Sequence, residues 1–99
     1  PMELLLAGAG GCSAFDVVLI LQRARQAISG CEVNLQAERA TEDPKVFTKI
    51  NLHFIVKGKD LDQAKVDRAV KLSHEKYCSA TTMLAKTAEL TYSVEIVSE

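Results

Sequence analysis

The chain of 99 residues has no tryptophan, only two prolines and no excess of charge of either sign. Its 12 basic and 13 acidic residues leave a net charge of −1, and neither a basic stripe nor an aromatic cluster is present. The sequence therefore offers nucleic acid little to bind. With 47% hydrophobic residues and no low-complexity tract, the composition is typical of a globular protein. The length suits one small domain over residues 1–99.

Cysteine is scarce and odd in number, and no CxxC pair exists: the three residues are Cys12, Cys31 and Cys78. A secreted disulfide framework favours an even count. The apolar stretch before Cys12 lacks the basic region of a signal peptide, since its only charge is Glu3. A membrane-spanning helix needs about 18 apolar residues, and no apolar run in the sequence approaches that length. We therefore expect a cytoplasmic protein with no membrane segment, in which one or two thiols work in the reduced state.

Hydrophobic periodicity predicts seven elements in the order α-α-β-β-α-α-β. The predicted helices cover residues 2–8, 13–28, 60–77 and 78–86, and the predicted strands cover residues 32–38, 47–59 and 90–97. Glycines at positions 8, 10 and 11 separate the first two helices, Gly30 ends the second, and Asp60 is the N-cap of the third. This order predicts an α+β fold with helices packed on one face of an antiparallel sheet.

Cys12 follows three glycines and lies at the predicted start of a buried helix. Free backbone N–H groups and the positive end of the helix dipole stabilise a thiolate at such a position. Cys78 repeats the arrangement at the junction of two predicted helices. A thiolate oxidised by peroxide becomes a sulfenic acid, which condenses with a second thiol to a disulfide, and this chemistry needs no cofactor. The alternative is that both cysteines are small core residues.

Three other residues have chemistry to consider. Cys31, at a predicted strand start, lacks a comparable setting, and we interpret it as structural. His74 and Cys78 are four residues apart, on one helix face, but two ligands make an incomplete metal site, so no bound metal is expected. Glu3, among leucines nine positions before Cys12, needs a cationic partner if it is buried, and an arginine there would also position a peroxide. No arginine of the chain is compelled by its position to be that partner.

Two segments together resemble the OsmC/Ohr family: residues 1–14, with Pro1-Met2-Glu3 and Gly10-Gly11-Cys12-Ser13-Ala14, and residues 76–80, Lys-Tyr-Cys-Ser-Ala. The element order matches that family over essentially the whole chain. Residues 7–16 and the Asn-Leu-His-Phe sequence at residues 51–54 are most similar to its YhfA-like branch. The resemblance implies an intertwined homodimer with helices in a shared core and with active sites at the dimer interface.

The resemblance further implies reduction of organic hydroperoxides, with Cys12 as the peroxidatic thiolate, Cys78 as the resolving thiol and a dithiol as reductant. Family members carry an additional N-terminal hairpin that supplies an activating arginine. This chain lacks it, so we expect an N-terminally truncated domain. Glu3 is one position from the usual place of the carboxylate that pairs with that arginine. Two alternatives remain open: a non-catalytic dimer that binds a small ligand or senses redox state, and a purely structural use of both thiols.

Overall fold

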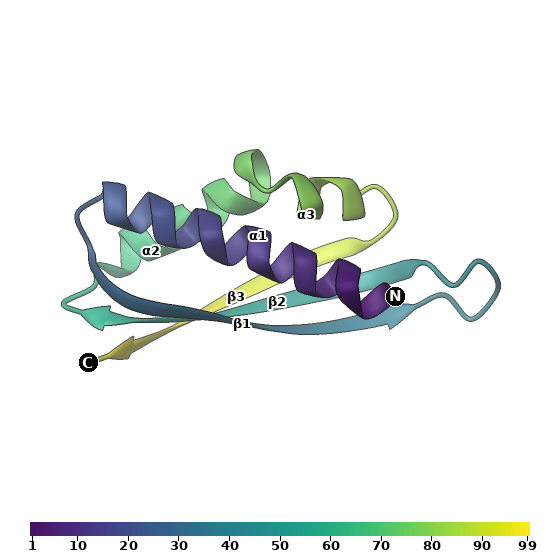
Figure 1. Cartoon of the computed structure of the whole chain (residues 1–99), viewed down its shortest axis with the longest axis horizontal. Helices are drawn as coiled ribbons and strands as arrows, with labels where there is room; N and C mark the ends of the chain where they lie inside the picture. Colours follow the sequence, from purple (N-terminus) through teal and green to yellow (C-terminus); the bar gives the residue numbers. More distant parts are fainter.

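The computed structural model describes all residues from 1 to 99 and contains one helical layer on one face of a sheet (Figure 1). The elements in chain order are α1 (Met2–Arg23), β1 (Ala27–Arg39), β2 (Phe47–Lys59), α2 (Gln63–Leu72), the π-helical turn η1 (Ser73–Tyr77), α3 (Ser79–Leu84) and β3 (Glu89–Ser98). The C-terminus lies near one end of the long axis, and the N-terminus lies towards the other end, which is formed by the turn between β1 and β2. The predicted α+β class, with helices on one face of a sheet, is confirmed.

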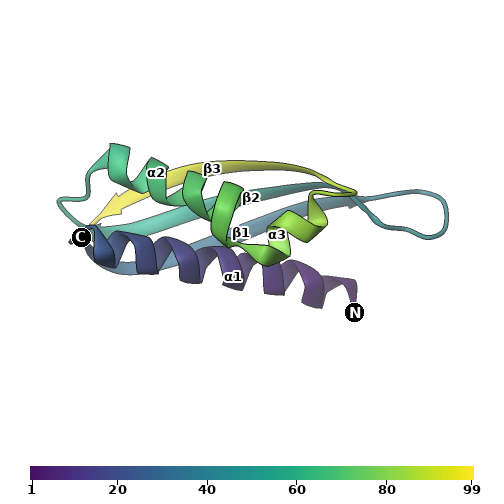
Figure 2. The ribbon, with the colours of Figure 1, turned by 90° about the horizontal axis from the view of Figure 1, so that it is seen from above.

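The three strands lie in the order β1-β2-β3, with β2 in the centre. β1 and β2 form an antiparallel hairpin, whereas β3 runs parallel to β2. The parallel pairing follows from the connection, because α2, η1 and α3 carry the chain back along the sheet before β3 begins (Figure 2). The prediction of a fully antiparallel sheet is therefore wrong at β3.

The core lies between β2 and the two longer helices. Ile50, Leu52, Phe54 and Val56 alternate along β2 and are at most 2% exposed, so the predicted face of this strand is confirmed. Buried side chains of α1 and α2 cover that face, and they include Val17, Leu21, Val66 and Val70.

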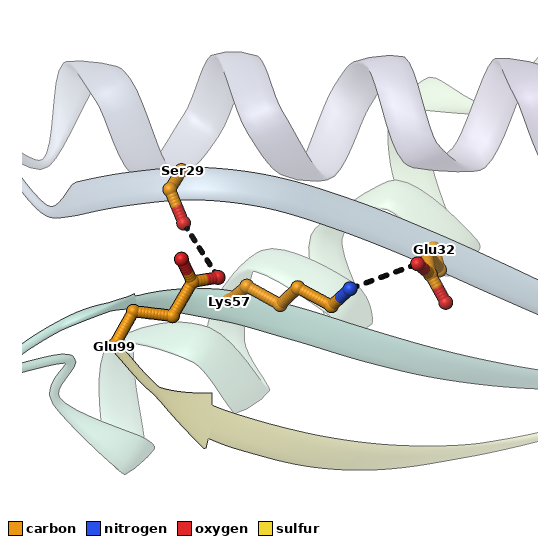
Figure 3. Close-up of polar contacts among 4 residues, drawn as sticks. All are labelled: Ser29, Glu32, Lys57 and Glu99. Carbon is orange, nitrogen blue, oxygen red and sulfur yellow. Dashed lines mark hydrogen bonds and ion pairs between the residues drawn. The ribbon is translucent and has the colours of Figure 1, made fainter.

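The opposite face of the sheet is polar. In Figure 3, the Ser29 hydroxyl donates a hydrogen bond to the Glu99 carboxylate at 3.0 Å, and the Lys57 ammonium lies 2.9 Å from the Glu32 carboxylate. Both contacts are exposed, and such surface contacts contribute about 0–1 kcal/mol of stability. The apolar core therefore lies on the other side of the sheet, which the helices cover.

The first two predicted helices are a single helix, α1, that continues through Gly8, Gly10 and Gly11. Each interior glycine costs about 1 kcal/mol of helix propensity relative to alanine. Burial of one face of α1 from Ala9 to Leu21 offsets that cost. Gly10 also allows α1 to approach β1 closely, since a Cβ atom there would lie 2.7 Å from Leu35 Cδ1.

Three predicted boundaries are also wrong. The chain leaves α1 at Arg23 and enters β1 at Ala27, so the predicted helical segment up to residue 28 is too long and Gly30 lies inside a strand. The N-cap of α2 is Asp62, whose carboxylate accepts a hydrogen bond from the Ala64 N–H at 2.9 Å. Asp60, the predicted cap, instead has a positive φ of 52° in the turn after β2.

As one helix of 22 residues, α1 is long and apolar enough to meet the length and composition criteria for a membrane span. The expectation that no apolar segment approaches that length is therefore wrong. Core helices of soluble proteins meet the same criteria, and α1 packs on the sheet with Val17 and Leu21 fully buried. The length and composition of α1 are thus weak evidence for a membrane.

Candidate thiol site

Cys12 and Cys78 converge although 66 positions (78 − 12 = 66) separate them in the sequence. Cys12 lies in the middle of α1, and Cys78 is the N-cap residue of α3. Packing of α3 against α1 brings the two elements together. The two sulfur atoms and one carboxylate oxygen of Asp16 all lie within 4.8 Å of one another. The predicted proximity of the two thiols is therefore present within a single chain.

Cys78 is fully buried and surrounded by hydrogen-bond donors. The Ser13 hydroxyl donates to Cys78 Sγ at 3.4 Å, and the Thr81 backbone N–H donates to the same atom at 3.5 Å. Burial alone would raise the pKa of the Cys78 thiol. Hydrogen bonds from Cys12, Ser13 and Thr81 outweigh burial and hold the pKa below its ordinary value. The predicted helix-start setting of Cys78 is confirmed.

Cys12 does not have the helix-start setting that its neighbouring glycines predict. Residues before and after it are helical, so the backbone N–H groups of its own helix are engaged in α1; the one backbone N–H that favours its thiolate is that of Ala80, in the first turn of α3. Burial raises the pKa of the Cys12 thiol, and so do the hydrogen bond with Cys78 and the charge of Asp16. When the reduced pair loses its first proton, Cys78 is therefore the favoured site of the negative charge, and Cys12 is the more exposed partner.

Asp16 and Ser73 belong to the site but were not predicted from the sequence. Asp16 lies one helical turn after Cys12 on α1, and Ser73 opens η1. The Ser73 hydroxyl lies 3.4 Å from both Asp16 Oδ2 and the Ser13 carbonyl oxygen. The i, i+4 spacing of Cys12 and Asp16 was the one available signal, since such residues share a helix face. Ser73 had none, because only the packing of η1 on α1 places it there.

A groove of about 410 Å³ between α1 and α2 begins at Asp16. Its walls are largely apolar and include Leu19, Ile20 and Leu72, while Arg23 and Arg68 supply positive charge. Cys12 and Cys78 do not line the groove. Asp16 does, and one of its carboxylate oxygens lies within 4.8 Å of both sulfur atoms. The groove thus has the composition of a site for an organic molecule with a polar group.

The remaining candidate residues lie away from the thiol pair. Glu3 is exposed near the start of α1, where its carboxylate lies 3.7 Å from the Pro1 amine. Nine residues of helix place it about 14 Å from Cys12. The His74 ring packs against Tyr92, with centroids 5.1 Å apart, so it does not join Cys78 in a metal cluster. Cys31 is half-buried in β1, and burial raises the pKa of its thiol.

The sequence model of the OsmC-like protein family matches residues 1–93. Protein YhfA of Escherichia coli K12 is 58% identical over 98 residues, which are 99% of this chain and 73% of that protein. The crystal structure of a hypothetical protein from Aquifex aeolicus is 35% identical with a TM-score of 0.95, covering 100% of this chain and 74% of the other.

The structure of an organic hydroperoxide resistance protein OsmC from Legionella pneumophila shares the fold at 19% identity. Its TM-score is 0.77, and the match covers 96% of this chain and 68% of that chain. The family match over nearly the whole chain and the identity to YhfA agree with the predicted resemblance. The chain belongs to the OsmC-like protein family.

Proposed function

We propose that Cys12 and Cys78 reduce organic hydroperoxides in a cycle that alternates between two thiols and one disulfide. The single observation that carries this proposal is the convergence of the two sulfur atoms within 4.8 Å from distant parts of the chain. Membership of the OsmC-like family and the organic hydroperoxide resistance protein among its structural relatives support the same reaction class.

In the proposed first step, Cys12 attacks the terminal peroxide oxygen while its proton passes to the Cys78 thiolate. The O–O bond breaks, Cys12 becomes a sulfenic acid, and the organic fragment leaves as an alcohol once it takes up a proton. The raised pKa of the Cys12 thiol favours this role in one respect, because intrinsic nucleophilicity of a thiolate rises with pKa. Cys12 is also the more exposed of the two sulfur-bearing residues.

In the second step, the Cys78 sulfur attacks the sulfenic sulfur, water leaves, and a Cys12–Cys78 disulfide forms. The two steps together consume two thiols and one hydroperoxide and yield a disulfide, an alcohol and water. A dithiol reductant then restores the thiols by exchange through a mixed disulfide. The chemistry is carried by the two sulfur atoms, and a reducing cytoplasmic setting would keep the resting pair ready for use.

We further propose that the working form is a homodimer. The outward face of α1 carries exposed apolar residues, and among them Leu4 is 76% and Phe15 is 68% exposed. Apolar surface of this kind is typical of a protein–protein interface. The family resemblance pairs this carboxylate with an activating arginine from the N-terminal hairpin of family members, and in a homodimer the exposed Glu3 side chain is also accessible to an arginine of a second subunit.

A ligand-binding or redox-sensing dimer is the second candidate function. The groove that begins at Asp16 favours it, because the groove offers an apolar wall and two arginine side chains to a small organic molecule. Under this proposal, peroxide turnover is slow and a small ligand copurifies with the protein.

The test is to add one equivalent of an organic hydroperoxide to the reduced protein in the presence of a sulfenic-acid probe. Peptide mapping should show a Cys12–Cys78 disulfide in the unmodified chain and a labelled Cys12 in the Cys78→Ser variant. The Cys12→Ser variant should remain unlabelled, and Cys31→Ser, as matched control, should form the disulfide normally. A label on Cys78 in the Cys12→Ser variant would reverse the two roles, and unreacted thiols would favour the ligand-binding function.

A further inference from the structure

Asp16 gives the thiol pair a third donor atom of a kind that binds metal ions. Two of the three donors, Cys12 and Asp16, come from successive turns of the rigid helix α1, and Cys78 comes from the N-cap position of α3. We propose that Cys12, Asp16 and Cys78 form a binding site for a thiophilic divalent cation, best matched by zinc, in the reduced protein.

The spacing of the donor atoms suits zinc. Tetrahedral zinc with Zn–S bonds of about 2.3 Å and Zn–O bonds of about 2.0–2.2 Å holds neighbouring ligand atoms roughly 3.5–3.8 Å apart. The three donor atoms here lie within 4.8 Å of one another, so shifts of about 1 Å in side-chain positions complete the geometry. Three protein ligands leave a fourth position open for water or another small ligand. Two thiolates select zinc over magnesium or calcium.

Neighbouring groups already orient the donor atoms. The Ser73 hydroxyl lies 3.4 Å from Asp16 Oδ2, and Cys78 Sγ accepts hydrogen bonds from the Ser13 hydroxyl and the Thr81 N–H. Outer-shell hydrogen bonds of this kind fix the direction of metal ligands. All of these partners are buried or partly buried, so Asp16 and Cys78 are already oriented, and only small side-chain shifts are needed when the ion binds.

The charge of the site also favours a cation. Two thiolates and one carboxylate carry three negative charges, and Asp16 belongs to none of the three ion pairs in the chain. Arg23 and Arg68 line the adjacent groove, but neither lies within 4.0 Å of the Asp16 carboxylate. A bound divalent ion lowers the magnitude of the net charge from −3 to −1, which allows both thiols to remain ionised.

Metal binding and disulfide formation exclude each other, because both use the same two sulfur atoms. When the reduced, metal-bound pair gives two electrons to an organic hydroperoxide, the hydroperoxide and two protons yield an alcohol and water. The pair becomes a disulfide and the metal ion is released. Binding to the reduced chain itself does not require the proposed peroxide chemistry, so the two proposals succeed or fail separately.

The test is an anaerobic titration of the reduced 99-residue protein with Co²⁺, followed by displacement with Zn²⁺. We expect one Co²⁺ per chain, the visible bands of a tetrahedral site and a near-ultraviolet thiolate-to-cobalt charge-transfer band. Zinc affinity is then measured by competition with a chromophoric chelator. Protein oxidised with diamide to the Cys12–Cys78 disulfide should bind neither ion.

The decisive variant is Asp16→Asn, which keeps the side-chain shape and removes the charge. Loss of an outer-shell partner lowers metal affinity by roughly 10- to 100-fold, and loss of a direct ligand in Asp16→Asn should lower zinc affinity by at least as much. Ser73→Ala, which removes an outer-shell partner, should lower zinc affinity by about 10-fold. Asp67→Asn, an acidic residue on the exposed face of α2, and Cys31→Ser are the matched controls and should bind as the unmodified chain does. Circular dichroism of each metal-free variant checks that the fold is intact.

Three results would overturn the proposal. One is the absence of a charge-transfer band in the reduced protein at one equivalent of Co²⁺. Another is unchanged zinc affinity in Asp16→Asn, which would leave the carboxylate without a role. The last is loss of binding in Cys31→Ser, which would place the metal elsewhere in the chain.

Discussion

Ser13 is the residue whose side chain most directly supports the thiol pair without taking part in electron transfer. It is 2% exposed, and its hydroxyl donates to Cys78 Sγ at 3.4 Å. A hydrogen bond to a charged acceptor contributes about 1.5–3 kcal/mol. Its removal in Ser13→Ala should therefore slow disulfide formation after one equivalent of hydroperoxide by about tenfold, which corresponds to about 1.4 kcal/mol.

Stopped-flow thiol loss measures this rate, and Ser29→Ala is a suitable control because the Ser29 hydroxyl contacts the exposed Glu99 carboxylate, away from the thiol pair. An equal rate in Ser13→Ala and in the unmodified protein would show that the Ser13 hydroxyl does not stabilise the reacting thiolate.

Cys31 predicts a pH dependence of stability that is separate from the thiol pair. Burial raises the pKa of this thiol in the folded chain. Above pH about 8.5, the unfolded chain releases the Cys31 proton while the folded chain keeps it. The stabilising contribution is thus complete below that pH and is lost as pH rises through the folded pKa. Denaturant unfolding should show a shallower alkaline loss in Cys31→Ala, and parallel curves for the two proteins would contradict the prediction.

At this scale, the sequence was informative about Cys78 and misleading about Cys12. The small and hydroxyl residues after Cys78 do start a helix, so a local signal was sufficient there. The glycines before Cys12 lie inside α1, and the pKa of that thiol is raised instead by burial, by the hydrogen bond with Cys78 and by the charge of Asp16. The contact with Cys78 depends on the packing of α3 against α1, which no local pattern encodes, whereas the contact with Asp16 follows from the i, i+4 spacing on α1.

At the scale of elements, the β1–β2 hairpin depends on the close approach of its backbones at Gly58. A Cβ atom at Gly58 would overlap the Ala27 carbonyl oxygen and would lie 3.0 Å from Leu61 Cδ1. A backbone oxygen cannot shift as readily as the end of a flexible side chain, so Gly58→Ala should destabilise the protein by about 1–3 kcal/mol.

Gly30, on the facing strand, is the matched control because a Cβ atom added there would have no neighbouring atom within 4 Å. Gly30→Ala should be neutral or stabilising by less than about 1 kcal/mol. Urea unfolding distinguishes the two variants, and equal midpoints would show that the strands tolerate a methyl group at Gly58.

The sequence predicted the existence of nearly every element, but it did not predict how they connect. Alternation along residues 90–97 identified β3 without giving its direction, because a period of two is the same for parallel and antiparallel strands. The glycines at positions 8, 10 and 11 indicated a break, since their local cost does not include the burial that holds α1 together. Tertiary packing decided both outcomes.

At the scale of the whole molecule, the outward face of α1 predicts self-association. Leu4, Gly8, Gly11 and Phe15 are exposed at spacings of four, three and four residues, which places them on one side of the helix. Two small residues between two large apolar ones allow a second helix to approach closely. Phe15→Glu should convert the proposed dimer to a monomer, because burying a carboxylate in an apolar interface is costly.

Sedimentation velocity measures the change in mass, and Lys65→Glu on the exposed side of α2 provides a control of altered charge. A monomeric unmodified protein at micromolar concentration would contradict this prediction.

The separation of Cys12 and Cys78 along the chain has a mechanical consequence. A covalent bond between them would enclose the second half of α1 together with β1, β2, α2 and η1 in one closed ring. In the chain-entropy description, a ring of this size stabilises the folded chain by about 4 kcal/mol. The oxidised molecule would then be the form that best withstands heat and proteases, and the thiol form the more compliant one. Resistance to proteolysis would thus distinguish oxidised from reduced molecules until a reductant cleaved the disulfide.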